Sequence, residues 1–235
     1  MSAIVQQSAT TFFFGDLTAK SASLTGVTAG NSLLLVASLY IFGGGTPTLS
    51  GNDGSAYSLA IENVFSSGSD RPTAGILYRH NVSSGNYTST LTIGGGISAA
   101  NCNGSFRLYE VSGLANAGAD KTATGGATSN TPSTGTTATL SQANGFAIAA
   151  LATTQTGADL PSGWTNLITT DGRQDYVLTS STTGIAANWG TMDASGGWSG
   201  VLAVFSDVAA GQPAGSRGRG VPGVRLGGQR FGRGW

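Results

Sequence analysis

The sequence predicts an all-β protein: an antiparallel β-sandwich of jelly-roll-like type with an extended C-terminal arm. Three observations support this. Helical periodicity is nearly absent from the chain. Short runs rich in Val, Ile, Leu, Thr, Tyr and Phe alternate with clusters of Gly, Asn, Asp and Ser, which is the pattern of strands and turns. Charged residues make up only 9% of the chain while 38 residues are glycine, a balance that suits many tight turns.

Strands are expected wherever such a run lies between two turn clusters. Within the run 32–42, residues 32–40 are apolar at both alternating sets of positions, as in a strand buried on both faces. The run 87–93 alternates, with Thr88, Thr90 and Thr92 on one face. Turns every 8–12 residues favour a sandwich. In order, the expected strands lie near 11–14, 23–27, 32–42, 57–65, 73–80, 87–93, 104–111, 121–124, 136–140, 145–153, 164–169, 175–180, 184–189 and 198–206.

Two blocks of the chain are half-similar. Residues 28–40 and 141–154 each begin with a turn and continue as a long apolar strand. This repetition allows two small sandwiches joined near 112–135, where Gly, Ser, Thr and Ala dominate. We favour a single body over residues 1–210, because the last strands are expected to complete its core.

Charge divides the chain into two parts. The body has six basic and eleven acidic residues, a net charge of −5, whereas residues 211–235 have five arginines and no acid. With nine glycines and two prolines, this segment cannot fold alone. Spaced apolar side chains with arginines between them suit an extended arm that lies in a groove of a neighbouring protein. The expected contact residues are Arg217, Arg219, Val221, Val224, Arg225, Leu226, Arg230, Phe231, Arg233 and Trp235.

An Arg-Gly tail can also bind nucleic acid. We consider nucleic acid an unlikely partner here, because the body of a nucleic-acid-binding protein would itself be basic. No membrane partner is expected either, since the longest apolar run, of 11 residues, is too short to span a bilayer as a helix. The N-terminal residues contain no basic segment of a standard secretory signal.

No catalytic, metal-binding or cofactor-binding set is expected. His80 and Cys102 are the only residues of their types, which excludes an intrachain disulfide and a zinc site built from several His or Cys ligands, and no G-x-S-x-G elbow is present. We expect Cys102 to be a small buried apolar residue. Glu62 and Glu110 are the candidates for buried carboxylates, each with a partner arginine, Arg79 or Arg107. The acids expected to face solvent from loops are Asp53, Asp70, Asp159, Asp171 and Asp175.

Aromatic residues near the later strands allow two interpretations. Trp164, Trp189 and Trp198 are expected mainly to pack in the core or at a sheet edge. The alternative is that they and Tyr176 form a platform on which a sugar stacks, because aromatic faces on sandwich loops hold carbohydrate in this way.

Several segments resemble the β-sandwich modules of tailed-bacteriophage virion proteins, which also occur in bacterial surface proteins. The segments are GNSLLLVASLY, GNDGSAYSLA, GILYRHNVSSGNYTSTLTI, RLYEVSGL and WSGVLAVF, spread over about residues 20–206. Members of this group serve as capsid decoration proteins, head fibres and tail-associated or receptor-binding parts. The resemblance implies a non-enzymatic structural role and carries no functional residue over.

The expected function is therefore that of a virion structural protein, with capsid decoration as the first choice. Its partners would be other virion proteins and further copies of itself, with a trimer as one candidate assembly. The alternative is a carbohydrate-binding receptor-recognition module of a phage tail or fibre.

Overall fold

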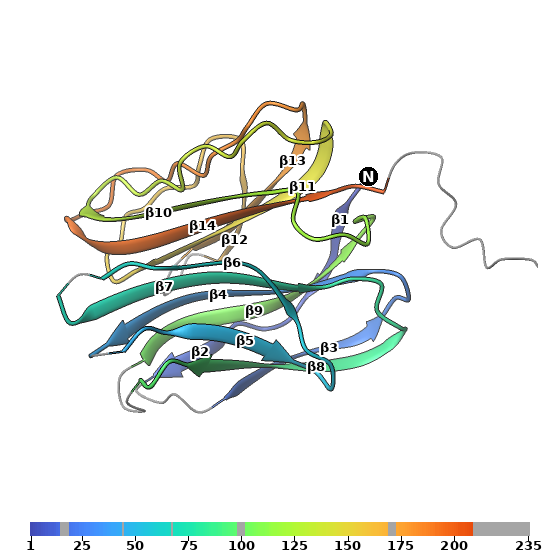
Figure 1. Ribbon diagram of the computed structural model, residues 1–235, viewed down its shortest axis with the longest axis horizontal. Helices are drawn as coiled ribbons and strands as arrows, with labels where there is room; N and C mark the ends of the chain where they lie inside the picture. Colours follow the sequence, from blue (N-terminus) through green and yellow to red (C-terminus); the bar gives the residue numbers. More distant parts are fainter. Residues whose placement is uncertain (15–18, 44, 67, 98–101, 169–172, 209–235) are drawn as a thin grey trace, which may run out of the picture.

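Three antiparallel sheets form the part of the chain that the structure describes, which comprises residues 1–14, 19–43, 45–66, 68–97, 102–168 and 173–208 of a computed structural model (Figure 1). The described residues contain no helix. The strands are β1 (Ala3–Gln7), β2 (Thr11–Phe14), β3 (Lys20–Val27), β4 (Ser32–Phe42), β5 (Thr48–Asn52), β6 (Ser58–Val64), β7 (Asp70–Arg79), β8 (Gly85–Gly94), β9 (Cys102–Ser112), β10 (Lys121–Ser129), β11 (Asn144–Thr153), β12 (Thr165–Ile168), β13 (Arg173–Ser180) and β14 (Gly196–Ser206).

The sheets lie on one another as layers. The central sheet has the order β1-β9-β4-β7-β6, and β2 also pairs with β9. The outer sheet, β3-β8-β5, covers one face of it, and the C-terminal sheet, β10-β14-β11-β13-β12, covers the other (Figure 1). The prediction of an all-β protein with packed antiparallel sheets is thereby confirmed.

Strand β4 shows why the central layer needs an apolar run. Ten of its eleven residues are buried. Leu33, Leu35 and Leu39 pack in the core beneath the outer sheet. Leu34 and Val36 point the opposite way, into the core shared with the C-terminal sheet. The expectation that residues 32–40 are buried on both faces is confirmed, because successive strand side chains alternate between faces and all of these residues are buried.

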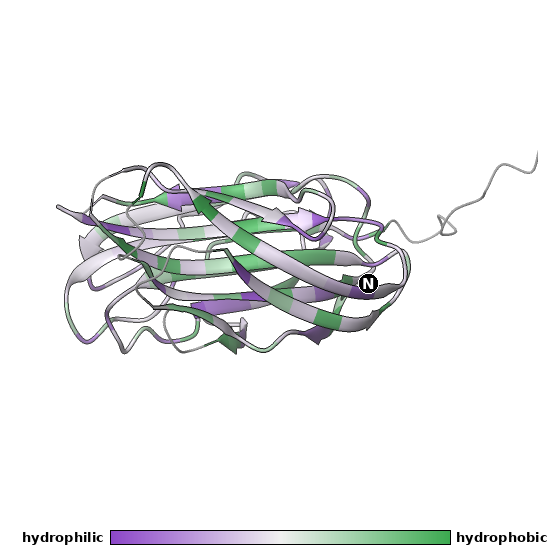
Figure 2. Ribbon diagram, turned by 90° about the horizontal axis from the view of Figure 1, so that it is seen from below, coloured by the Kyte–Doolittle hydropathy of each residue, from purple (hydrophilic) through white to green (hydrophobic). Residues whose placement is uncertain are grey.

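One face of the outer sheet is exposed to solvent. Its strands show hydrophobic patches alternating with hydrophilic ones, which Figure 2 shows from below. The exposed face carries hydroxyl pairs across β3 and β8, with Ser21 Oγ 2.8 Å from Thr90 Oγ1 and Ser23 Oγ 2.9 Å from Thr88 Oγ1. This sheet therefore shows the alternation expected of an antiparallel sheet with one solvated face.

Irregular chain covers the far face of the C-terminal sheet. Residues 136–140 and 184–189 are not strands, contrary to the prediction. They run beside each other with scattered bonds, such as Thr137 N to Ile185 O at 2.8 Å and Leu140 N to Thr182 O at 2.8 Å. Conversely, β1 and β5 were not predicted, because each is a five-residue edge strand without a strong apolar signal.

The central and C-terminal sheets have matching strand orders. Strands β9, β4, β7 and β6 lie in the same succession as β14, β11, β13 and β12. The half-similar block 28–40 contains most of β4 and the block 141–154 contains β11, and these two strands occupy equivalent places. The chain passes from one sheet to the other between β9 and β10. The placement of a domain boundary near 112–135 remains a prediction.

Apolar packing and a few polar bonds join these two sheets. Their shared core includes Ile76, Tyr109, Phe146 and Phe205, all at most 1% exposed. Within it, Tyr109 Oη donates to Gln174 Oε1 at 2.6 Å. At the β6 edge, Asn63 Nδ2 donates to Gly125 O at 2.8 Å and Ser199 Oγ donates to Asn63 O at 2.8 Å. These bonds satisfy polar groups that would otherwise be buried at a cost.

Candidate functional site

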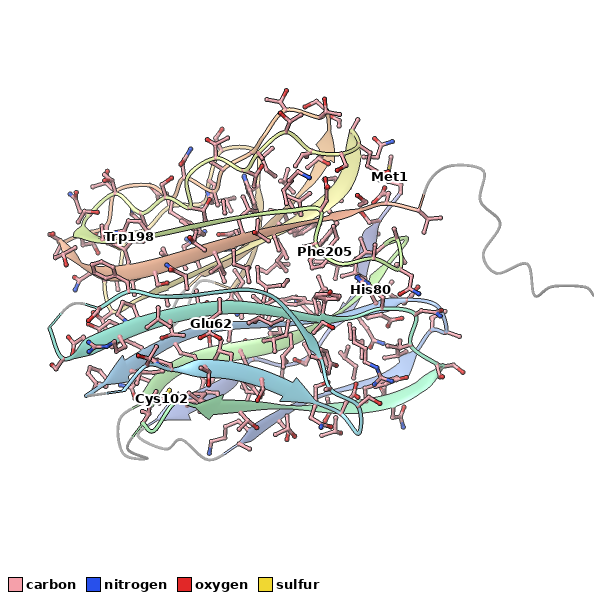
Figure 3. All side chains as sticks on the ribbon, in the orientation of Figure 1. Met1, Glu62, His80, Cys102, Trp198 and Phe205 are labelled. Atoms are coloured by element: carbon pink, nitrogen blue, oxygen red, sulfur yellow. The ribbon has the colours of Figure 1, made fainter. Side chains whose placement is uncertain are left out.

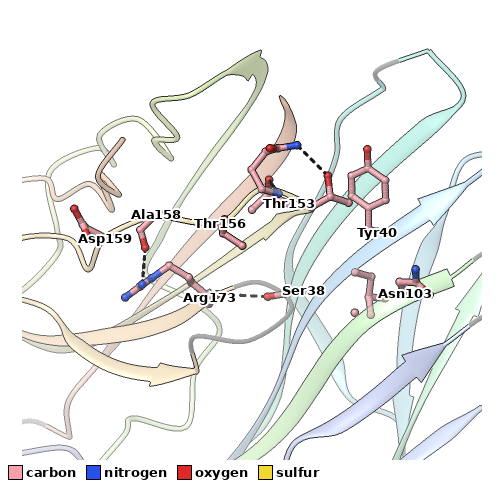
Figure 4. Close-up of a pocket in the computed structure, with 13 residues that line it drawn as sticks. Ser38, Tyr40, Asn103, Thr153, Thr156, Ala158, Asp159 and Arg173 are labelled. Atoms are coloured by element: carbon pink, nitrogen blue, oxygen red, sulfur yellow. Dashed lines mark hydrogen bonds between the residues drawn. The ribbon is translucent and has the colours of Figure 1, made fainter. Parts of the chain in front are cut away.

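A pocket of about 470 Å³ opens between the central sheet and the C-terminal sheet (Figure 4). Four separate segments line it: the end of β4, the start of β9, the end of β11 with the loop that follows, and the start of β13. Its lining residues are Ser38, Leu39, Tyr40, Asn103, Gly104, Thr153, Thr154, Gln155, Thr156, Gly157, Ala158, Asp159 and Arg173. Hydroxyl, amide and charged groups dominate this list, so the pocket suits a polar ligand or a polar segment of protein.

Arg173 forms the inner wall of the pocket. Its Nη1 donates to Ala158 O at 2.5 Å, and its Nη2 lies 3.5 Å from Asp175 Oδ1. The Asp175 carboxylate is fully buried and also accepts from Trp189 Nε1 at 2.7 Å and Asn166 Nδ2 at 2.9 Å. Burial raises the pKa of Asp175, and these donors together with Arg173 oppose the rise. Arg173 therefore has an internal counter-ion.

Tyr40 contributes an aromatic ring to the opposite wall. Its Oη donates to Asp70 Oδ2 at 2.9 Å. Burial, followed by the bond to Asp70 and the charge of that carboxylate, raises the pKa of Tyr40. The phenol is thus a neutral donor near neutral pH, and it links the pocket to an acidic residue at the start of β7.

Two exposed carboxylates lie at the pocket loop. Asp159 lines the pocket directly. Asp193 accepts from Thr156 Oγ1 at 2.5 Å, and its backbone N donates to Thr156 O at 2.9 Å. The loop after β11 is thereby tied to the chain that precedes β14. This arrangement keeps both carboxylates at the edge of the pocket.

His80 lies beside a second, smaller pocket of about 250 Å³. Its Nδ1 is 2.7 Å from Ser32 Oγ, and its ring packs 4.8 Å from Tyr78 and 5.7 Å from Phe205 (Figure 3). Burial lowers the pKa of His80. Ser32 is only 1% exposed, so its hydroxyl is closed to a substrate. The contact between Ser32 and His80 is therefore a packing interaction inside the protein.

The tryptophans considered for sugar stacking lie in the core. Trp164 is 8% exposed, and Trp189 and Trp198 are each 4% exposed. They pack with Leu151 and Leu202 beneath the irregular cover of the C-terminal sheet. Tyr176 stacks on Phe146, with ring centroids 5.4 Å apart. These positions are those of the core-packing interpretation, and none of the four side chains lines the 470 Å³ pocket.

Glu110 and Glu62, the two candidates for buried carboxylates, differ from expectation in their bonding partners. Glu110 is fully buried, but it accepts from Gln6 Nε2 at 2.5 Å, Thr28 N at 2.8 Å and Asn31 Nδ2 at 2.6 Å, and the expected partner arginine was wrong. Glu62 is half-buried and accepts from Leu49 N at 2.8 Å.

Arg79 instead pairs with Asp53, whose side chain is fully buried. Arg107 donates to Leu167 O at 3.0 Å and to Thr10 Oγ1. The expectation that Asp53 and Asp175 face solvent was therefore wrong: both side chains are buried and ion-paired. Asp171 lies outside the described residues.

Cys102 is buried, as expected, and burial raises the pKa of its thiol to about 12. Within the described ranges, no three His, Cys, Asp or Glu side chains are grouped so that they could hold a metal ion. No helix of these residues is long and apolar enough to cross a membrane. Every residue assigned to the C-terminal arm lies beyond Val208, outside the described part of the chain.

Sequence reasoning missed the 470 Å³ pocket. Its walls come from positions 38–40, 103–104, 153–159 and 173, which only the stacking of two sheets brings together. The one local signal is the polar, glycine-containing stretch that follows the apolar strand β11.

Comparisons with known proteins identify no relative. No family model matches the chain, and neither a curated protein nor a solved structure matches it.

Proposed function

We propose that this chain is a non-enzymatic structural protein of a tailed-bacteriophage virion, with capsid decoration as the first assignment. Residues 1–210 would form a rigid body, and residues 211–235 an arm that anchors it to neighbouring subunits. Other virion proteins and further copies of this chain would be its partners, and a trimer is one candidate assembly.

The main support for this proposal is that most described carboxylates of the body are buried and bonded within it. Nine of the eleven acids lie in the described residues, and five of these have side chains at most 9% exposed that take part in internal bonds: Asp53, Glu110, Asp120, Asp175 and Asp207. Such groups hold strands together and are not placed to meet a substrate. The arm has five arginines and no acid, so its own residues cannot neutralise its charge. This favours binding of the arm to another molecule.

The strand order supports a jelly-roll arrangement. Counting the paired edge strands β1 and β2 together as the first of eight, the central sheet contains strands 1-8-3-6 and the outer sheet contains 2-7-4. This succession resembles that of a double-sheet jelly roll and supports the proposal of such a fold. It departs from a jelly roll at the fifth strand, β6, which pairs with β7 at the edge of the central sheet. The matching order of the C-terminal sheet supports a second, partial copy whose outer layer is irregular.

Removal of the arm tests the proposal. We expect protein lacking residues 211–235 to fold like the full chain but to fail to join particles or oligomers. Full-length protein with all five arm arginines changed to glutamine should behave in the same way if charge drives anchoring. Light scattering with the circular dichroism spectrum as a folding control would measure this. Normal assembly of both variants would refute the proposal.

Carbohydrate recognition is a second candidate, favoured by the lining of the 470 Å³ pocket. Tyr40, Asn103, Gln155 and Asp159 supply the aromatic, amide and carboxylate groups that hold sugar hydroxyls. Binding on a glycan array that is lost in Asn103→Ala and kept in Trp198→Phe would favour this function. A flat array for the intact protein would exclude it for the glycans tested.

A further inference from the structure

Among the described residues, most of the accessible carboxylates lie at or beside the 470 Å³ pocket. Besides the five buried ones, the described acids are Glu62, Asp70, Asp159 and Asp193. Asp159 lines the pocket, Asp193 accepts from the lining residue Thr156 at 2.5 Å, and Asp70 accepts from the lining residue Tyr40 at 2.9 Å. Of these four described acids, Glu62 alone lies elsewhere, where it accepts from Leu49 N.

The basic residues nearby have partners of their own. Arg173 has its counter-ion in the fully buried Asp175 and donates to Ala158 O. Arg71, next to Asp70 in the chain, donates from Nη1 to Gly68 O at 2.7 Å. Within the described residues, neither guanidinium forms a hydrogen bond or an ion pair with Asp159 or Asp193. The edge of the pocket therefore favours a cation from another molecule.

The described part of the chain ends at Val208, at the opposite end of the body. Gly196, at the start of β14, lies against the side chain of the pocket residue Gln155. From there β14 runs 11 residues to Ser206, or about 33 Å at the usual rise of a strand. Val208 N then donates to Gly113 O at 2.8 Å, near the N-terminal strand (Figure 1). The arm therefore starts far from the pocket of its own copy.

We propose that this pocket receives the arginine-bearing arm of a second copy of the chain, so that copies join head to tail. The proposal rests on the function proposed above and names the partner surface that the arm needs. An arginine fork can donate to the carboxylates of Asp159 and Asp193.

The dimensions permit this contact. A pocket of about 470 Å³ accommodates one or two large side chains of the arm. Residues 209–235 span at most about 90 Å when extended, so the arm can pass from its own exit to the pocket of an adjacent copy. A head-to-tail contact of this kind closes into a ring when its rotation allows and otherwise continues as a filament.

Two full-length variants test the proposal. The pocket variant is Asp159→Asn with Asp193→Asn, which removes two charges and keeps side chains of the same size. The arm variant changes Arg217, Arg219, Arg225, Arg230 and Arg233 to glutamine. Glu62→Gln is the matched control for charge, because Glu62 lies away from the pocket and a glutamine retains an acceptor for Leu49 N. Light scattering over a range of concentrations measures self-association.

We expect the intact protein and the Glu62→Gln control to self-associate alike. The pocket variant should need a roughly tenfold higher concentration, the effect of losing two exposed ion pairs. The arm variant should be monomeric. A mixture of the two variants should form one-to-one heterodimers when the arm variant is in excess, because each such pair contains one working arm and one working pocket.

Other outcomes separate the two proposals. If the pocket variant associates like the intact protein while the arm variant is monomeric, the arm anchors elsewhere, and only the pocket proposal fails. If both variants associate like the intact protein, both proposals fail. An intact protein that stays monomeric, or a mixture without heterodimers, excludes docking into a second copy, including the case in which the arm folds back onto its own pocket.

Discussion

The contact between Tyr109 and Gln174 is a fully buried polar link between the central and C-terminal sheets. Gln174 is fully buried, accepts from Tyr109 Oη at 2.6 Å and donates from Nε2 to Val36 O at 3.1 Å. The amide can serve both partners only in this orientation. A strand residue between two sheets is thereby fixed by hydrogen bonds as well as by packing.

Replacing Tyr109 with phenylalanine should destabilise the protein. The change keeps the ring but leaves Gln174 Oε1 buried without its donor, which should lower the free energy of unfolding by about 1–3 kcal/mol. Urea denaturation followed by circular dichroism would measure it. Tyr87→Phe is the control, because the Tyr87 hydroxyl donates to Ser83 O at an exposed position. Equal losses in the two variants would contradict this account.

The raised pKa of Glu62 predicts how the free energy of unfolding changes with pH. Burial raises its pKa above the ordinary 4.5, and the bond from Leu49 N only partly opposes this. Glu62 therefore binds a proton more readily in the folded state than in the unfolded state. At neutral pH its charged form lowers the free energy of unfolding, and this loss disappears as the pH falls through the raised pKa. Glu62→Gln should be more stable than the intact protein at pH 7, with the difference shrinking toward pH 4.5. A difference that grows on acidification would refute it.

At the scale of elements, apolar runs were the reliable signal. Strands β4, β11 and β14 are buried on both faces, and all three were predicted because almost every residue is apolar or small. Residues 136–140 and 184–189 have strand-like composition, yet they form only isolated bonds to each other. Their side chains cover the indoles of the C-terminal sheet, and this packing does not require a continuous ladder.

The site was less predictable than the strands. Burial of Asp53 and Asp175 depends on partners 26 and 2 residues away in sequence, Arg79 and Arg173, and on the depth of the surrounding loops. The pocket depends on how two sheets stack at one end. Neither local composition nor periodicity contains that information, whereas it does contain the alternation that defines a strand face.

Gly104 allows β9 to approach β4 at the pocket. Its φ is +132°, and a Cβ there would overlap Ser38 O and Leu39 Cα. Gly104→Ala should therefore lower the free energy of unfolding by more than about 2 kcal/mol. The control is Gly68→Ala, at φ +65° with open space around it, which should cost about 1 kcal/mol. Urea midpoints compare the two, and an equal or smaller effect at Gly104 would contradict the close approach.

On the scale of the whole molecule, the shared core predicts cooperative unfolding. The tryptophans at 164, 189 and 198 all lie in the C-terminal sheet and its cover, so their fluorescence reports that part alone. Circular dichroism reports every strand. Because Ile76 and Phe146 belong to one core between the sheets, we expect both signals to change at the same urea concentration.

The measurement uses Trp235→Phe, which removes the tryptophan of the arm. A fluorescence transition at lower urea than the circular dichroism transition would mean that the C-terminal sheet unfolds separately, and the boundary near 112–135 would then separate two domains.

Strand β14 is hydrogen-bonded on both sides, to β10 through nine residue pairs and to β11 through nine. It is also the last described strand, and the residues assigned to the arm follow it in the sequence. A pull on the residues beyond Val208, directed along this strand, would load the bonds of both ladders in shear at the same time. A pull across the strand would open them one after another. An anchor attached here would therefore resist mechanical force best along one axis, that of the stacked strands.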